Sequence, residues 1–155
     1  MDYSKLLNPT VVKIKPSGIR KFFDIAAEME DVISLGVGEP DFQTPWHIRQ
    51  AGIKSLQDGK TKYTSNWGLS ELRRAVCDYM REQVGVSYDP EHEILISVGG
   101  SEAIDAAVRA IVGYGDEVLI VEPSFVCYEP IVRLAGGVPV IIPTKAENQF
   151  RLTAE

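Results

Sequence analysis

The spacing of hydrophobic residues predicts helices in the first half of the chain. Apolar side chains recur at helical intervals after Ser17, after Thr44-Pro45 and after Ser70. Ser17 is a good N-cap, and Thr44-Pro45 is typical of a helix start with proline at the first helical position. The first helix carries Ile19, Phe22, Phe23 and Ala26 on one face, and the third carries Leu72, Ala75, Val76, Tyr79 and Met80 at helical spacing. In the second helix, the residues expected to face inward are Ile48, Ala51, Gly52 and Leu56.

The second half alternates between strand-like and helix-like segments. The expected order is strand 94–98, helix 101–112, strand 118–121, helix 125–135 and strand 138–142. The strands are continuous runs of Val, Ile and Leu, which is typical of strands that are buried on both faces. We therefore expect an α/β layered structure with much parallel pairing.

Polar and glycine-rich stretches separate these elements. GVGEPDFQTP at 36–45 and TKYTSNWG at 61–68 are predicted loops, and residues 32–35 before the first loop are a candidate for a short strand. The chain stops shortly after Thr153, which is well placed to cap a further helix. We therefore expect the 155 residues to be a piece of a longer protein.

Composition narrows the class of protein. The chain has 22 acidic and 16 basic residues and a formal net charge of −6, without the basic stripe that is typical of nucleic-acid binding. Arg73-Arg74 is expected to be a solvated pair on a helix. This charge pattern argues against a nucleic acid as partner. There is also no apolar run of membrane-spanning length and no signal-peptide pattern, so we do not expect a membrane as partner.

The cysteines and histidines do not suggest a metal or disulfide framework. Cys77 and Cys127 lie outside any CxxC motif and are predicted to be reduced thiols of a cytoplasmic protein. His47 and His92 are interpreted as surface residues, so no metal site is predicted.

The stretch SVGGSEAIDAAV at 97–108 places Gly99-Gly100-Ser101 between a predicted strand and a predicted helix. Glycine allows a ligand to approach the backbone closely, and the N–H groups at a helix start attract an anion such as phosphate. The Ser101 hydroxyl can donate as well, while Glu102 has to turn its carboxylate away from a phosphate. A tight turn capped by Ser101 is the alternative that needs no ligand.

Two nucleotide-binding motifs are excluded. A P-loop needs a lysine directly before its Ser or Thr, and Ser101 follows a glycine. A dinucleotide fingerprint needs three glycines that open a helix, whereas GVGEPD at 36–41 has two glycines and contains Pro40.

Four further loop residues are candidates for ligand contact, and each has a structural alternative. Gly38 could bring a backbone N–H close to a small ligand, or belong to an ordinary loop. Tyr63 and Trp67 could anchor a ligand or a partner, or pack their own loop down. Phe125 follows a predicted strand, so its ring could stack on a flat cofactor at the C-terminal edge of the sheet. The alternative for Phe125 is a core position at a helix start.

Four stretches, taken in order, resemble the N-terminal part of the class I/II aminotransferases, the fold-type-I enzymes that depend on pyridoxal 5′-phosphate (PLP). These stretches are ISLGVGEPDFQTP, YTSNWGLSELRRAV, ISVGGSEAIDAAVRAI and GDEVLIVEPSFVCYEPIVRLAGGVPV. The resemblance covers nearly the whole chain and is closest to the bacterial aspartate and aromatic aminotransferases. It implies that residues 44–155 are the incomplete first part of a three-layer αβα large domain. Residues 1–43 would supply an N-terminal arm and a segment of the small domain.

The resemblance also implies which residues bind the cofactor. Gly100 and Ser101 correspond to residues that hold the PLP phosphate, with Gly99 and Glu102 beside them. Phe125 corresponds to the aromatic residue that stacks on the pyridine ring.

Two further roles concern the substrate and a partner subunit. Gly38 corresponds to the glycine whose backbone meets the substrate carboxylate. Tyr63 corresponds to the tyrosine that reaches the PLP phosphate of the neighbouring subunit, which implies a homodimer with shared active sites. Tyr128, one helical turn after Phe125, is expected to line the ring pocket.

The implied activity is the transfer of an amino group between an amino acid and a 2-oxo acid. The Schiff-base lysine of the family, the aspartate at the pyridine nitrogen and the arginines for phosphate and carboxylate lie beyond the position that matches Glu155. No catalytic residue is therefore expected within the 155 residues, and the chain alone is expected to be inactive. Two alternatives stay open, namely a PLP lyase on the same scaffold and a non-catalytic structural or interaction module.

Overall fold

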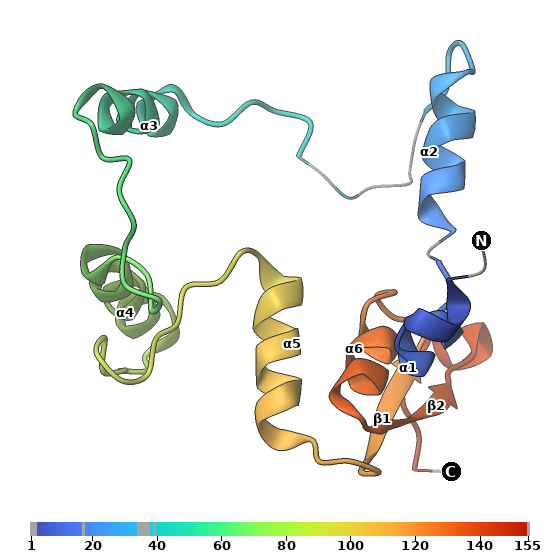
Figure 1. The fold of residues 1–155 in the computed structure, drawn as a ribbon. Helices are drawn as coiled ribbons and strands as arrows, with labels where there is room; N and C mark the ends of the chain where they lie inside the picture. Colours follow the sequence, from blue (N-terminus) through green and yellow to red (C-terminus); the bar gives the residue numbers. More distant parts are fainter. Residues whose placement is uncertain (1–2, 17, 34–37, 39, 155) are drawn as a thin grey trace. The chain divides into compact units, whose positions relative to one another are not determined.

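A computed structural model describes residues 3–16, 18–33, 38 and 40–154 (Figure 1). The chain divides into two compact units, one formed by residues 1–20 and 97–155 and the other by residues 21–96. The elements are η1 (Ser4–Leu6), α1 (Pro9–Lys13), α2 (Ile19–Ala27), α3 (Trp46–Gln57), α4 (Ser70–Val84), α5 (Gly100–Ile111), β1 (Glu117–Glu122), α6 (Tyr128–Ala135), β2 (Val138–Pro143) and η2 (Ala146–Asn148).

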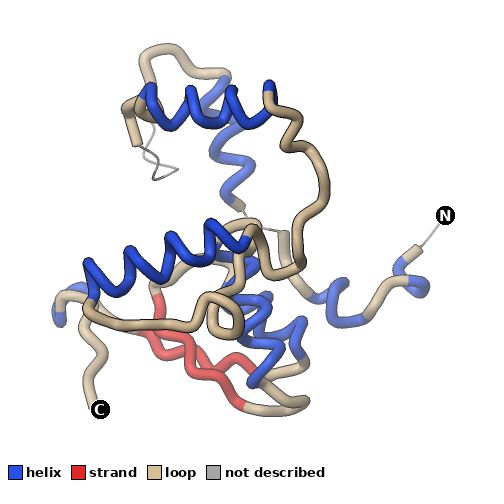
Figure 2. The backbone as a smooth tube through the Cα atoms, turned by 90° about the vertical axis from the view of Figure 1, so that its left-hand side faces the viewer, coloured by secondary structure: helices blue, strands red, loops and turns tan. Residues whose placement is uncertain are grey.

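The core of the first unit lies between α6 and a two-stranded sheet. β1 and β2 run parallel and side by side over their full lengths (Figure 2). α6 connects the two strands and packs against both of them, and it also contacts α5 and α1. Ile120, Ile131 and Val132 are buried there, with Val132 only 2% exposed. The expected α/β class with parallel strands is therefore confirmed.

The corner between α6 and β2 is packed tightly enough to require glycine. A Cβ at Gly137 would lie 2.7 Å from Cγ1 of Val112 and 3.0 Å from Cγ1 of Val132. The sheet is less covered than its sequence suggests, because Leu119 on β1 is 66% exposed. A continuous apolar run predicts which residues can be buried on both faces, but burial itself needs a second covering layer, and the described elements cover one face.

In the second unit the helices form where the pattern predicts, but their apolar residues are not all inward. α3 begins at Trp46, with Pro45 as its N-cap rather than its first residue. Ile48 and Leu56 of α3 are 52% and 67% exposed, so the prediction that they face inward is wrong. Periodicity identifies residues that share a helix face, whereas their burial depends on a neighbouring element.

The burial of Arg73 corrects another expectation. Arg73 is 5% exposed, so the prediction that it is solvated is wrong, whereas the side chain of Arg74 is 62% exposed as expected. Nη1 of Arg73 donates to the carbonyl oxygen of Pro90 at 2.5 Å, and Nη2 lies 3.3 Å from Oε2 of Glu91. These acceptors compensate the burial of the guanidinium, although its Nε has no partner among the described residues.

Two boundaries in the second half also differ from the sequence prediction. Residues 94–98 do not form a strand, because no described segment pairs with them along a ladder. Single hydrogen bonds replace a ladder here: the N–H of Ile96 donates to the carbonyl oxygen of Trp67 at 3.1 Å, and the N–H of Val98 donates to the carboxylate of Glu102. The helix expected over 125–135 begins three positions later, at Tyr128, because Phe125 belongs to the turn that precedes it.

Some expectations fall on parts of the chain that the structure does not cover. Ser17 and residues 34–35 lie outside the described residues, and Val32 and Ile33 are not in a strand.

Both cysteines are free, Cys77 buried and Cys127 partly buried. Within the described ranges, each helix is too short or too polar to cross a bilayer.

Candidate functional site

The turn before α5 has the geometry of an anion-binding helix start. Gly99 is the N-cap residue and has a φ of 91° and a ψ of 168°, a conformation that side chains with a Cβ rarely adopt. The first backbone bond of the helix runs from the N–H of Ala103 to the carbonyl oxygen of Gly99, at 3.3 Å. The N–H groups of Gly100, Ser101 and Glu102 precede that bond and therefore have no acceptor in the helix.

The two glycines add no side chain to this turn, and the positions where a side chain would begin are open. A Cβ placed on either Gly99 or Gly100 would meet no atom within 4 Å. The helix start has no side-chain cap, so the alternative of a turn capped by the Ser101 hydroxyl is not what the structure contains. Three N–H groups without a helical acceptor, the Ser101 hydroxyl, which has no hydrogen-bond partner among the described residues, and the positive end of a helix dipole fit a phosphate group.

Glu102 has a defined partner at this helix start. Its Oε2 accepts a hydrogen bond from the backbone N–H of Val98, so the carboxylate, although exposed, folds back over the turn. A carboxylate in the first helical turn interacts favourably with the dipole. It also places negative charge near the position where a phosphate would sit.

Phe125 lies in the loop between β1 and α6, in the same unit as the α5 turn. Its ring is 54% exposed, so Phe125 is not a core residue. The ring contacts Tyr128 edge to face, with the ring centres 6.0 Å apart and the planes at 73°. The packing of α6 against α5 holds the loops before these two helices in one unit. Phe125 thus presents a free aromatic face at the carboxyl end of a strand.

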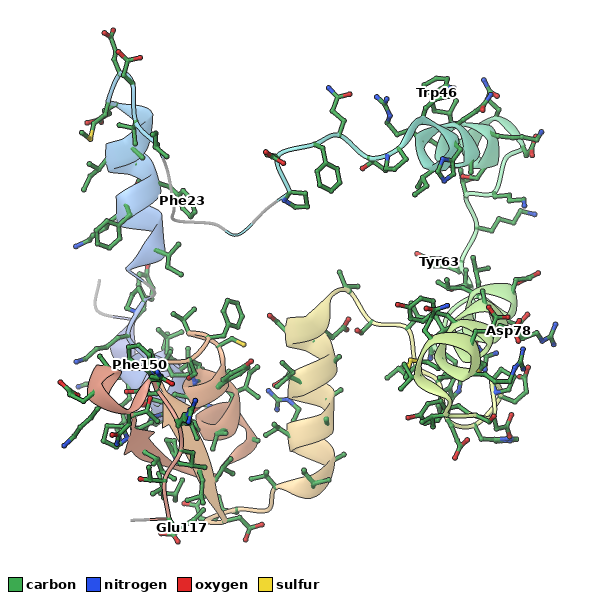
Figure 3. The ribbon with its side chains drawn as sticks, turned by 180° about the vertical axis from the view of Figure 1, so that it is seen from behind. Phe23, Trp46, Tyr63, Asp78, Glu117 and Phe150 are labelled. Carbon is green, nitrogen blue, oxygen red and sulfur yellow. The ribbon has the colours of Figure 1, made fainter. Side chains whose placement is uncertain are left out.

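Tyr63 and Gly38 belong to the second unit. Tyr63 is fully exposed in the loop between α3 and α4, where its side chain projects into solvent (Figure 3). The loop is ordered by a turn in which Ser65 accepts hydrogen bonds from the N–H groups of Trp67 and Gly68, at 3.2 and 2.9 Å. Trp67 is 48% exposed and therefore does not bury its ring. Gly38 is exposed, and both of its neighbours in the chain lie outside the described residues.

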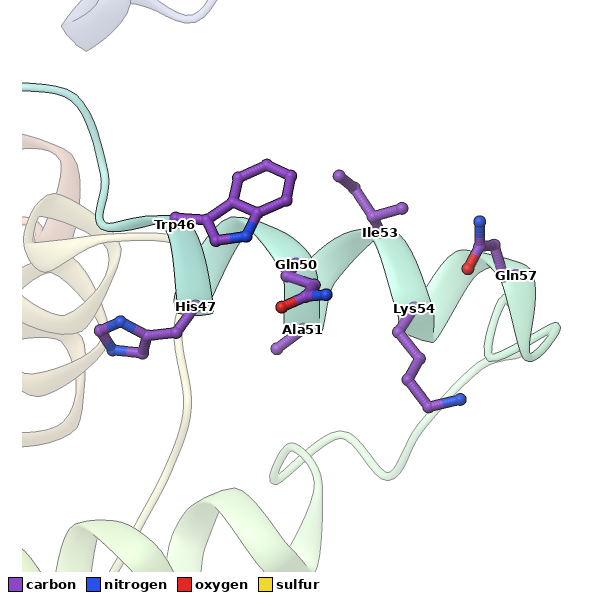
Figure 4. A pocket seen from close by; sticks show the side chains of 7 residues that line it. All are labelled: Trp46, His47, Gln50, Ala51, Ile53, Lys54 and Gln57. Atoms are coloured by element: carbon purple, nitrogen blue, oxygen red, sulfur yellow. The ribbon is translucent and has the colours of Figure 1, made fainter.

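An open hollow on α3 is a separate feature (Figure 4). It is lined by Trp46, His47, Gln50, Ala51, Ile53, Lys54 and Gln57, which all come from this one helix. Its lysine is paired with Asp58 at 3.2 Å, and the guanidinium of Arg49 lies 5.3 Å from the Trp46 ring centre. The hollow includes Trp46 and His47 at the helix start, but Pro45 rather than glycine precedes them, and bulky side chains stand where the α5 turn has Gly99 and Gly100.

The histidines lie outside the candidate site. His47 is exposed, and Nδ1 of His92 lies 2.7 Å from Oδ2 of Asp89 on a surface turn. The hydrogen bond to Asp89 raises the pKa of His92, and the same bond lowers the pKa of Asp89. In the portion of the chain that the structure describes, no group of acidic, Cys and His side chains is arranged to hold a metal ion.

One position of structural interest has only a weak signal in the sequence. Gly68 sits in the Tyr63 loop with a φ of 92°, beside Ile96. The only sequence signal is a glycine at the end of a polar loop, directly before the Leu69 that caps α4. Its close neighbour is distant in sequence and could not be identified from the pattern.

Comparison with known proteins identifies aminotransferases as relatives of this chain. The family model for aminotransferase class I and II matches residues 30–155. An aspartate aminotransferase of Pyrococcus abyssi is 49% identical over 142 residues, which are 92% of this chain and 36% of that protein. Aromatic-amino-acid aminotransferase 2 of Thermococcus litoralis is 44% identical over 149 residues, which are 96% of this chain and 38% of that protein.

The structural comparison agrees with the sequence comparison. Aspartate aminotransferase from Thermus thermophilus with maleate superposes with a TM-score of 0.84 at 38% identity, covering 95% of this chain and 39% of that chain. The chain thus spans less than two fifths of the length of these relatives, and it matches their N-terminal portion. The family match over residues 30–155 and the shared α/β fold show that the chain belongs to the class I and II aminotransferases.

Proposed function

We propose that the protein containing this chain is a PLP-dependent aminotransferase. It would exchange the amino group of an amino acid for the carbonyl oxygen of a 2-oxo acid. The observation that carries the proposal is the start of α5, where three N–H groups without a helical acceptor lie beside two glycines whose Cβ positions are open. Membership of the aminotransferase family suggests that the anion bound there is the phosphate of PLP.

The residues of this chain would hold the cofactor at two points. The backbones of Gly100 and Ser101, the Ser101 hydroxyl and the N–H of Glu102 would bind the phosphate. Phe125, with its exposed ring face, would stack on the pyridine ring, and Tyr128 would support it from the side. When bound, PLP supplies an aldehyde that accepts the amino group and a ring that withdraws electrons from the substrate.

Two further assignments involve the substrate and a second subunit. The backbone of Gly38 would meet the substrate carboxylate. Tyr63 would reach the phosphate of a partner subunit in a homodimer, and its full exposure supports this role. We also assign residues 1–43 to the small domain and residues 44–155 to the PLP-binding domain. The two free cysteines fit a cytoplasmic protein.

The test uses the full-length protein. We expect stoichiometric PLP binding with visible absorbance, and transfer of the amino group from an amino acid panel to 2-oxo acids with release of the matching 2-oxo acid. Product analysis separates transfer from elimination, which would indicate a PLP lyase. A protein that neither binds PLP nor transfers an amino group would contradict the proposal.

A further inference from the structure

The loop that contains Tyr63 packs against Ile96 through Gly68, at a distance that leaves no room for a side chain. A Cβ on Gly68 would lie 2.6 Å from both Cβ and Cγ1 of Ile96. The optimal van der Waals separation of two non-bonded carbon atoms is about 3.5–4.0 Å, so this contact has no room for a side chain. The φ of 92° at Gly68 is also one that side chains with a Cβ rarely adopt.

Hydrogen bonds hold the same two segments together. The N–H of Ile96 donates to the carbonyl oxygen of Trp67 at 3.1 Å, directly beside the Gly68 contact. The turn is closed on its other side by the bond from the N–H of Gly68 to the carbonyl oxygen of Ser65, at 2.9 Å. Tyr63 lies two residues before this closed turn.

A second anchor fixes the other end of the segment that contains Ile96. Arg73, in the first turn of α4 after the loop, is buried and donates to the carbonyl oxygen of Pro90 at 2.5 Å. Residues 65–73 therefore contact the segment 90–96 at both of its ends, at Pro90 and at Ile96. In the sequence, Ile96 is four residues before Gly100, the first residue of α5.

We propose that Gly68 is a positioning residue for PLP binding, which acts by holding Tyr63 in place for the partner subunit's phosphate. This inference rests on the proposed function. The role assigned to Gly68 is indirect: its lack of a side chain lets the loop close against Ile96. Because the loop cannot close around a larger residue, any substitution at position 68 should displace the Tyr63 hydroxyl.

The experiment compares PLP with pyridoxal, which lacks the phosphate, in the full-length dimer. Gly68→Ala should weaken PLP binding by about tenfold or more, since small displacements of positioned groups have effects of this size. Pyridoxal binding should change by less than about twofold, because Tyr63 would act on the phosphate alone. A general loss of structure would weaken both ligands equally and would overturn the proposal.

A double-mutant cycle tests whether Gly68 acts through Tyr63. Gly68→Ala should have little further effect on PLP binding in a Tyr63→Phe background, since the group that it positions is then absent. Effects that multiply would contradict the proposal. Failure of the wild-type protein to bind PLP would instead refute the proposed function, so the two failures are distinguishable.

Two more variants serve as a control and as a second test of the Gly68 contact. Gly59→Ala is the matched control, because Gly59 also has a positive φ of 70° but a Cβ there would meet nothing within 4 Å. It should leave the preference for PLP over pyridoxal unchanged. Ile96→Ala keeps the Gly68 backbone and removes the packing over the turn, so it tests the role even if Gly68→Ala does not fold. It should lower PLP affinity selectively by a smaller factor, and an unchanged affinity would count against the proposal.

Discussion

The carboxylate of Glu102 accepts a hydrogen bond from the backbone N–H of Val98, which closes the turn in front of α5. The bond joins the third residue of the helix to the residue before its N-cap. It therefore shapes the turn that presents the three unpaired N–H groups. The same carboxylate brings negative charge to a site that we expect to hold a phosphate.

These two roles of Glu102 are separable by substitution. Glu102→Gln keeps an oxygen acceptor for the N–H of Val98 and removes the charge, so PLP should bind at least as tightly as to the wild type. Glu102→Ala removes both the acceptor and the charge and should lower the free energy of unfolding by about 0.5–1 kcal/mol. We expect weaker PLP binding in this variant because the turn is less fixed. Fluorescence titration of both variants checks the order, and tighter binding by the Ala variant than by the Gln variant would contradict it.

Arg73 should contribute much more to stability than its neighbour Arg74. Both lie near Glu91, but Arg73 is buried and bonded to Pro90, whereas the side chain of Arg74 is 62% exposed. Arg73→Ala should cost about 2–3 kcal/mol, because it removes a buried guanidinium and leaves its acceptors unpaired. Arg74→Ala should cost less than about 0.5 kcal/mol. Urea unfolding of the full-length protein measures both, and equal costs would show that the burial of Arg73 is unimportant.

The pair of His92 and Asp89 gives a pH-dependent prediction. The hydrogen bond to Asp89 raises the pKa of His92 above its ordinary value of 6.5, so its stabilising contribution is present below that value and is lost as the pH rises through the raised pKa. The pKa of Asp89 is lowered from 3.8, so its contribution is present above that value and is lost as the pH falls through the lowered pKa. An NMR titration should show a lower pKa for His92 in Asp89→Asn. An unchanged pKa would mean that the bond is absent in solution.

The local pattern predicted the elements that depend on neighbours in sequence. α5, β1 and β2 lie within two residues of their expected bounds, because helical spacing and apolar runs are properties of the segments themselves. The prediction of a strand at 94–98 was wrong, because a strand also requires a second strand to pair with, and the local pattern does not specify one. The burial of Arg73 was missed for the same reason, because it depends on a carbonyl group seventeen residues away.

The candidate site was predictable only in part. The glycine turn before α5 and the position of Phe125 after β1 follow from local sequence, although the strand expected before the glycines is absent and α6 begins three residues after Phe125. The contact of Gly68 with Ile96 joins positions 28 residues apart and has no periodic signature. The roles of Gly38 and Tyr63 stay predictions, since they involve a substrate and a second subunit.

The central claim is that the start of α5 holds the PLP phosphate, and Gly100→Ala in the full-length protein tests it most directly. A methyl group at Gly100 meets no protein atom, so the fold should keep its stability while the methyl obstructs the phosphate. Gly52→Ala, in the middle of α3 and equally unobstructed, is the matched control. We predict that the wild type and Gly52→Ala bind PLP at least about 100-fold more tightly than pyridoxal, as several charge-assisted hydrogen bonds would allow. This preference should fall at least about tenfold in Gly100→Ala. An unchanged preference in Gly100→Ala, at unchanged stability, would contradict the account.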